Sequence, residues 1–162
     1  MSEQTANQMD YELDGALIQE EPTTVVRCLS FQVDDLILFL NTDYIVEIVN
    51  DYPITPLPMI PSFIKGMINL RGQIFPVLDM RLCMDKPPVE YTSKTCIIRL
   101  NIDSVPLCII VDSVCQVLDI DFQDIRPIPA KRQQKLLNGM IDLGNGNVIM
   151  SFDCNVLLER RY

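Results

Sequence analysis

The stretch TCIIRLNIDSVPLCIIVDSVCQVLDI (residues 95–120) consists of three short runs of β-branched and apolar residues, separated by short polar segments. Runs of this length and composition are typical of β-strands when turn residues bound them. We therefore predict strands over 95–100, 105–112 and 114–120, with residues 101–104 forming a hairpin connection between the first two.

The same pattern continues on both sides of this stretch. Residues 25–33, 36–40 and 43–49 are rich in β-branched and apolar residues, and Asn145-Gly146 is a strong signal for a tight hairpin. Together these runs predict about nine or ten short strands, with turns every eight to twelve residues and little helix. The spacing indicates a mainly β fold, built as a sandwich or as small barrels.

The segment 84–94 is the best candidate for a linker, because it contains two adjacent prolines and little apolar content. It leaves about 65 residues on each side, which favours two small barrels over one large sheet with long edges. We expect a first barrel over about 23–83 and a second over about 94–152. A C-terminal helix over about 153–160 should follow, with Asp153 as its cap.

Residues 1–22 differ from the rest of the chain. They include six acidic residues, no Lys or Arg and few large apolar residues. We predict that this acidic tail is mostly disordered and that the folded domain spans 23–158. A short binding motif within 11–18 is the alternative.

Composition excludes several classes of function. The net charge of −9 argues against nucleic acid or anionic lipid as the main partner, because phosphate binding needs a basic face. The chain has no His, its six cysteines form no C-x-x-C pair, and no phosphate-binding glycine motif is present. Nucleophile systems that depend on His are therefore absent. We expect no metal, no cofactor and no enzymatic activity.

Most of the cysteines lie among Val, Ile and Leu, where a free thiol behaves as a small core residue. No signal segment opens the chain, and no apolar run approaches the length needed to span a membrane. These features predict a cytoplasmic protein with reduced thiols.

A second stretch, GMINLRGQIFPVLDMRL (66–82), places an arginine between two glycines, just before a predicted strand over 74–82. The arginine could belong to an ordinary turn, or to a contact surface that the sheet supports.

The longer run FIKGMINLRGQIFPVLDMRL (63–82) resembles the motif F-I-x-G-x-x-N-L-R-G-x-x-x-P-V-x-D-L-R of the chemotaxis coupling protein family, CheW. Met80 stands where Leu is usual, which is a mild apolar exchange. Two later stretches also fit, 108–121 followed by 125–129, and 136–158, so the resemblance covers residues 24–158. The acidic tail lies outside it.

The resemblance implies two intertwined five-stranded SH3-like barrels with a short C-terminal helix. It also implies a non-enzymatic adaptor that links the cytoplasmic tip of methyl-accepting transmembrane chemoreceptors to the regulatory domain of the histidine kinase CheA. Such an adaptor would be cytoplasmic and recruited to receptor arrays at the inner face of the membrane, which it would contact only through the receptors.

The resemblance further implies two contact sites. A receptor-binding groove between the barrels would map to positions in the predicted third strand and around the arginine motif: Ile45, Glu47, Lys65, Gly66, Asn69, Arg71 and Gly72. The kinase contact would map to apolar positions on the second barrel: Cys96, Val114 and Val117.

Each position also has a plain structural interpretation. Glu47 could be a lone charge on a half-exposed strand, and Arg71 a turn residue whose aliphatic stem covers its neighbours. Gly66 and Gly72 could serve only the turn geometry. We hypothesise that Glu47 and Arg71 pair, and that the pair orients the guanidinium for a receptor helix.

The three kinase-facing residues could simply be core, and burial decides between the two interpretations. An interface residue must be exposed in the isolated chain.

Two other functions compete with the chemotaxis adaptor. One is a CheW-like adaptor of a parallel chemosensory system that controls pili or cyclic-nucleotide output. The other is a small-ligand or oligonucleotide-binding barrel, which would need exposed stacking aromatics in a basic groove. The absence of Trp and the negative net charge count against the second.

Overall fold

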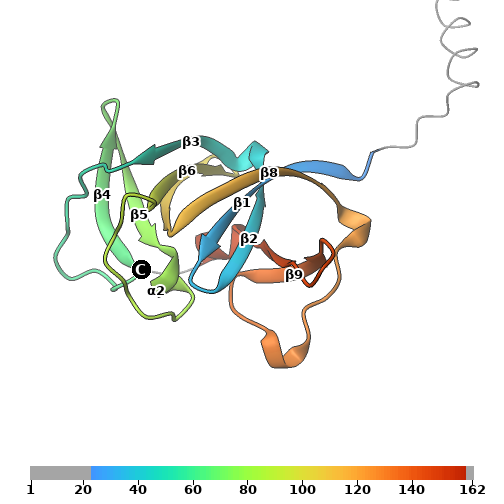
Figure 1. The fold of residues 1–162 in the computed structure, drawn as a ribbon. Coiled ribbons are helices and arrows are strands. Elements are labelled where there is room, and N and C mark those ends of the chain that lie inside the picture. The colour runs from blue at the N-terminus through green and yellow to red at the C-terminus, as the bar shows by residue number, and fades with distance from the viewer. Residues whose placement is uncertain (1–22, 160–162) are drawn as a thin grey trace, which may run out of the picture.

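The computed structural model describes residues 23–159, and in this range the chain forms ten strands in two five-stranded sheets with two short α-helices (Figure 1). The acidic segment 1–22 and residue 160 of the predicted helix lie outside the described residues. None of the described helices has the length and apolar character needed to cross a bilayer.

The strands, in chain order, are β1 (Val25–Val33), β2 (Leu36–Asn41), β3 (Ile45–Asn50), β4 (Ile64–Leu70), β5 (Gln73–Asp79), β6 (Cys96–Ile102), β7 (Val105–Val111), β8 (Ser113–Asp121), β9 (Leu137–Asp142) and β10 (Val148–Phe152). The helices are α2 (Met80–Cys83) and α3 (Asn155–Glu159), with 3-10 turns η1 (Thr42–Tyr44), η2 (Phe122–Asp124) and η3 (Ala130–Arg132).

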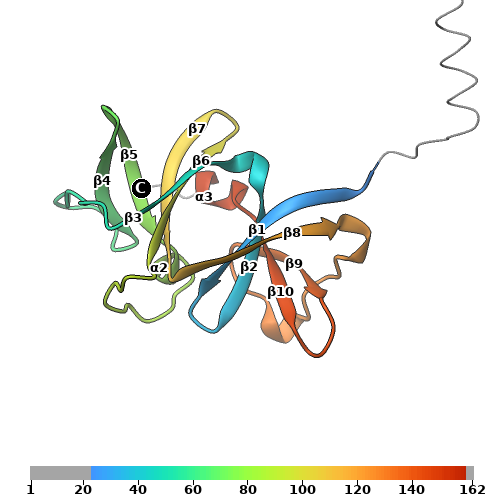
Figure 2. The same cartoon turned by 45° about the horizontal axis from the view of Figure 1, so that its top comes forward.

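The two sheets share one pattern of strand pairing. The first sheet has the order β8-β1-β2-β10-β9, and the second has the order β3-β6-β7-β5-β4. Each is antiparallel except for one parallel pair, β2 with β10 in the first and β5 with β7 in the second. The sheets form two lobes side by side in both views (Figures 1 and 2). The predicted mainly β class, with two five-stranded sheets and a short C-terminal helix, is confirmed.

The predicted division into one barrel over 23–83 and another over 94–152 is wrong. The second sheet takes its strands from the middle of the chain, β3 to β7, whereas the first sheet combines β1 and β2 with β8 to β10. The segment 84–94 connects strands of the same sheet, and the chain changes sheet at η1 and at Asp112. Local composition marks strands and loops, but it does not say which distant strands pair.

The strand predicted over 74–82 ends earlier, at Asp79. The Asp79 side chain accepts hydrogen bonds from the backbone N–H groups of Arg81 (2.9 Å) and Leu82 (3.4 Å) and so caps α2. Its second oxygen accepts a hydrogen bond from the Tyr91 hydroxyl, 2.8 Å away. The Asp79 cap therefore starts a helix at Met80, although the alternation of apolar residues alone predicts that the strand continues.

Arg81 joins the two sheets through what we call the Arg81 network, made of Arg81, Asp34 and Asp112. Its Nε and Nη2 donate to the two Asp112 oxygens at 2.9 and 2.8 Å, and its Nη1 lies 3.1 Å from Asp34 Oδ1. Asp34 belongs to the β1–β2 turn, and Asp112 lies where the chain crosses from β7 to β8. The hydrogen bond to Asp112 is the main cause that raises the pKa of Arg81, and burial opposes it.

Three apolar clusters fill the molecule. The largest lies between the sheets and includes the edge-to-face pair Phe31 and Phe152, whose ring centroids are 6.0 Å apart. A second cluster, within the first sheet, contains Cys28, Phe39, Ile120, Ile141 and Ile149. The third, which we call the inner cluster of the second sheet, contains Ile68, Leu70, Phe75, Val77, Ile97, Cys108 and Ile110.

Burial predicts which thiols react. All six cysteines are free thiols, and only Cys115 is exposed. Burial raises the pKa of Cys28 to about 11 and that of Cys108 to about 12, so these groups stay protonated near neutral pH, whereas the thiolate is the reactive form.

Iodoacetamide labelling of the native protein, followed by mass spectrometry, should modify Cys115 first, and Cys115→Ser should remove the fast phase. Fast labelling of a second cysteine would contradict the assigned core.

Candidate functional site

The Glu47 side chain lies between two guanidinium groups in the second sheet. Its Oε2 is 3.1 Å from Nη2 of Arg71, and its Oε1 accepts a hydrogen bond of 3.4 Å from Nη1 of Arg99. The Glu47 side chain is 16% exposed and that of Arg71 is 81% exposed. The predicted Glu47–Arg71 pair is therefore confirmed, and Arg99 completes what we call the Glu47 cluster.

Arg99 is the member of this cluster that the sequence did not reveal. It lies opposite Glu47 in the antiparallel β3–β6 pair. Its guanidinium carbon lies 4.4 Å from the centroid of the Phe75 ring, and Nη2 donates to Gln73 Oε1 at 3.2 Å. The available signal was a single arginine inside an apolar strand run. Its partner depends on strand register, which the sequence does not provide.

Arg71 stands at the tip of the β4–β5 hairpin. It has φ 54° and Gly72 has φ 84°, so both central residues of this two-residue turn are left-handed, as a type I′ turn requires. The Asn69 side chain accepts a hydrogen bond of 3.0 Å from the Gly72 backbone N–H. Asn69 and Gly72 thus shape the turn that exposes Arg71.

Gly66 has a different role, because it is buried within β4. It has φ 144°, and a Cβ added there would lie 2.0 Å from the carbonyl oxygen of Thr55. Thr55 exchanges two backbone hydrogen bonds of 2.8 Å with Met67, so it cannot move away without breaking them. Gly66 therefore allows a close backbone approach and offers no exposed contact surface.

The other two groove positions are half-buried. Ile45 packs against the cluster between the sheets, and Lys65 precedes Gly66 in β4. Of the seven positions that the resemblance implied, the structure brings the side chains of Glu47 and Arg71 into direct contact.

The Glu47 cluster borders the inner cluster of the second sheet, because Arg99 lies over the ring of Phe75. Cys108 pairs with Arg99 across β6 and β7 and belongs to that apolar interior. Burial is the main cause that raises the pKa of Cys108, with Arg99 lowering it and Glu47 raising it. The arrangement presents one exposed guanidinium paired with a carboxylate, and its free N–H groups suit hydrogen bonding to carboxylate or carbonyl groups of a partner.

The three kinase-facing positions do not form one surface. Cys96 is 7% exposed and lies in the second sheet, so it fails the requirement that an interface residue be exposed. Val114 and Val117 lie in β8, at the edge of the first sheet. Val114 is half-buried against the cluster between the sheets, whereas Val117 is 55% exposed. The implied contact of Cys96 is therefore wrong, because its side chain is part of the core.

Comparisons with known proteins agree with this architecture. The model of the family described as CheW-like domain matches residues 27–161. The chemotaxis protein CheW of Rhizobium meliloti is 32% identical over 101 residues, which are 62% of this chain and 65% of that protein. The chemotaxis protein CheW of Thermotoga maritima is 30% identical over 133 residues, which are 81% of this chain and 86% of that protein.

A solved structure is also similar. The crystal structure of the scaffolding protein TtCheW from Thermoanaerobacter tengcongensis superposes with a TM-score of 0.72 at 28% sequence identity, covering 78% of this chain and 88% of that one. The chain spans less than two thirds of the length of the Rhizobium meliloti relative, namely 65%.

The geometry of the Glu47 cluster predicts unequal effects on stability. Glu47→Gln leaves two guanidinium groups facing each other without a carboxylate and should lower the free energy of unfolding by about 1–3 kcal/mol. Arg71→Gln, the matched change at the exposed member, should cost less than about 1 kcal/mol. Urea unfolding of both variants measures the difference. Equal losses would show that Arg71 is as important for folding as Glu47.

Proposed function

The chain belongs to the family of CheW-like domain proteins, and from this premise we propose that it is a non-enzymatic adaptor in chemotaxis. It would couple transmembrane chemoreceptors to the histidine kinase CheA. The observation that carries the proposal is the exposed guanidinium of Arg71, at the tip of the β4–β5 hairpin. It forms an ion pair with the largely buried carboxylate of Glu47.

Receptor contact is proposed for the surface around Arg71. The left-handed turn raises this side chain above β4 and β5, and the ion pair restricts its rotation before any partner arrives. A receptor helix that offers a carboxylate or a free carbonyl would therefore meet a preoriented donor, which reduces the entropy lost on binding. Lys65 and Ile45 would lie at the margin of this contact.

Kinase contact is proposed for β8, with Val117 as the exposed apolar residue and Val114 as a half-buried residue of the same strand. The partner would be the regulatory domain of CheA. This surface lies on the first sheet, whereas Arg71 lies on the second, so one adaptor could bind a receptor and a kinase at the same time.

Contacts of this kind need not be strong. A small signalling interface often buries less than about 1,200 Å², and a dissociation constant near micromolar corresponds to roughly −8 kcal/mol. In an array at the inner face of the membrane, repeated contacts would add through avidity. The protein would meet the membrane only through the receptors.

Co-sedimentation with receptor-tip fragments and with the CheA regulatory domain, separately and together, tests the proposal. The wild-type chain should bind both. Arg71→Glu should weaken receptor binding by about tenfold or more, because a carboxylate then faces the partner's acceptor groups. Its melting temperature should stay nearly unchanged, since the side chain is exposed.

Two matched controls make this test specific. Arg132→Glu changes the net charge by the same amount at an exposed arginine in η3 and should leave receptor binding intact. Val117→Asp should weaken kinase binding, whereas Val105→Asp, at a valine that is 44% exposed in the other sheet, should not. Failure of the wild-type chain to bind either partner would overturn the proposal.

A further inference from the structure

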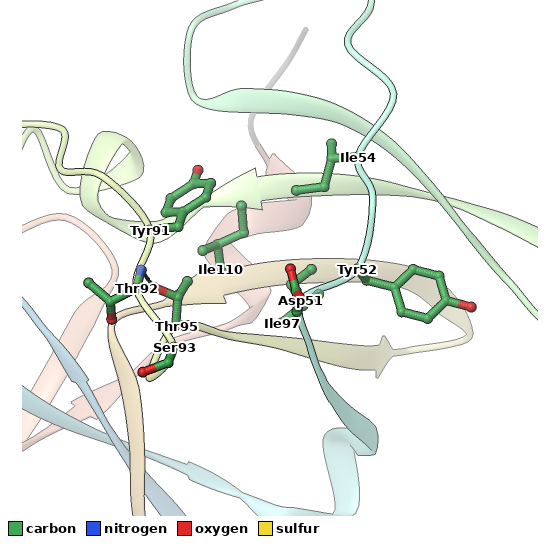
Figure 3. A pocket seen from close by; sticks show the side chains of 9 residues that line it. All are labelled: Asp51, Tyr52, Ile54, Tyr91, Thr92, Ser93, Thr95, Ile97 and Ile110. Atoms are coloured by element: carbon green, nitrogen blue, oxygen red, sulfur yellow. Dashed lines mark hydrogen bonds between the residues drawn. The ribbon is translucent and has the colours of Figure 1, made fainter.

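A cavity of about 420 Å³ lies at the end of the second sheet where β3 finishes and β6 begins (Figure 3). Its lining comes from the β3–β4 connection, from the end of the 84–95 segment and from two strands: Asp51, Tyr52, Ile54, Tyr91, Thr92, Ser93, Thr95, Ile97 and Ile110. This volume is within the range of ordinary ligand pockets.

Hydrogen bonds fix one wall of the cavity, the turn at residues 92–95. The Thr92 backbone N–H donates to Thr95 Oγ1 at 2.8 Å, and the Thr95 N–H donates to the Thr92 carbonyl at 3.1 Å. Tyr91 anchors this wall to the sheet through its hydrogen bond to Asp79, a residue that is 4% exposed. The wall is therefore formed before any ligand binds.

The opposite wall is fixed as well. Ile54 precedes Thr55, whose two backbone hydrogen bonds to Met67 join the β3–β4 connection to β4. The close approach at Gly66 makes this junction possible, because any side chain at that position would collide with the Thr55 carbonyl. Because both walls are already fixed by hydrogen bonds, binding a ligand would cost little entropy for ordering the protein.

The floor of the cavity is apolar, and its lining includes one exposed acidic residue, Asp51. Ile97 and Ile110 belong to the inner cluster of the second sheet and are 5% and 3% exposed. Asp51, with φ 49°, is the charged group in the lining, and its carboxylate takes part in no ion pair within residues 23–159. Lys94 belongs to the neighbouring turn but does not line the cavity.

Figure 3 shows which of the lining side chains point into the cavity and which point away from it. The ring of Tyr52 points away from the other labelled side chains, whereas Ile54 and Ile110 point toward the space between the two walls. The cavity therefore lacks the facing aromatic rings that would enclose a quaternary ammonium ion. Beside the hydroxyl groups of Thr92, Ser93 and Thr95, the lining offers aliphatic contact through the isoleucines and one carboxylate, that of Asp51.

We propose that this cavity is a second docking site, which takes an aliphatic side chain of a partner protein where that side chain adjoins a Lys or Arg. The aliphatic group would rest on Ile97 and Ile110, and the cation would pair with Asp51. The site is separate from the Glu47 cluster. Val49 faces Ile97 in the β3–β6 register and Glu47 faces Arg99, so the floor of the cavity and the Glu47 cluster are two residues apart along this strand pair.

Methyl NMR on the wild-type chain tests the proposal with two short peptides, acetyl-Gly-Leu-Arg-Gly-amide and its Glu analogue, acetyl-Gly-Leu-Glu-Gly-amide. The Arg peptide should shift the methyl signals of Ile54, Ile97 and Ile110 in a saturable way, with a dissociation constant of about millimolar order, as expected for so small a ligand. The Glu peptide should bind at least about threefold more weakly, because its charge opposes Asp51.

Two variants check the role of the carboxylate. Asp51→Asn keeps a residue that tolerates left-handed φ and should make the two peptides bind alike. Asp103→Asn is the matched control, since Asp103 is also exposed and left-handed (φ 50°) but lies in the β6–β7 turn. It should preserve the difference between the peptides, as should Arg71→Glu, which addresses the other site.

Three results would overturn the proposal: no saturable shift of these methyl signals with the Arg peptide, equal affinity of the wild-type chain for both peptides, or a difference that survives Asp51→Asn. If Asp51→Asn does not fold, the peptide pair on the wild-type chain decides alone. None of these outcomes depends on receptor or kinase binding, so the adaptor function is tested separately.

Discussion

The Arg81 network is the interaction on which the two-sheet arrangement depends. Arg81 is the last residue of the family motif and lies in α2. Its guanidinium binds Asp112, where the chain leaves the second sheet, and Asp34, in the β1–β2 turn of the first sheet. The Arg81 side chain is 14% exposed, so loss of one partner would leave a poorly solvated charge. Because β8 must return to pair with β1, this contact fixes the position of the edge strand that we propose for the kinase.

The second sheet carries the two surfaces with the clearest chemistry. Its apolar interior adjoins both the Glu47 cluster, through Arg99 and Phe75, and the Asp51 cavity, through Ile97 and Ile110. In the cluster, the Glu47 carboxylate pairs with Arg71 and Arg99, and the Arg71 guanidinium remains exposed to solvent. In the cavity, the Asp51 carboxylate forms no ion pair with any of the described residues. The second sheet thus carries two contact points of opposite charge, the Arg71 guanidinium and the Asp51 carboxylate.

The sequence predicted the local features well and the long-range ones poorly. Strand β1 and the Asn145-Gly146 hairpin follow from β-branched runs and from a turn pair with φ 55° and 76°. The Glu47–Arg71 pair could be predicted because the resemblance placed both residues in one groove. Arg99 and the exchange of strands between halves could not, since both depend on which distant strands pair. Cys96 was misassigned because the local sequence looks the same whether an apolar residue is buried in the core or exposed at a contact surface.

We infer that receptor docking depends on Arg71 and folding on Arg81. The most direct test measures urea unfolding and receptor-fragment binding on the same preparations of Arg71→Gln and Arg81→Gln. We predict that Arg71→Gln weakens binding while its free energy of unfolding changes by less than about 1 kcal/mol. Arg81→Gln should lose about 2 kcal/mol or more, because its two carboxylate partners are partly buried. Its folded fraction should still bind the receptor fragment. Parallel losses of stability and binding in both variants would contradict the account.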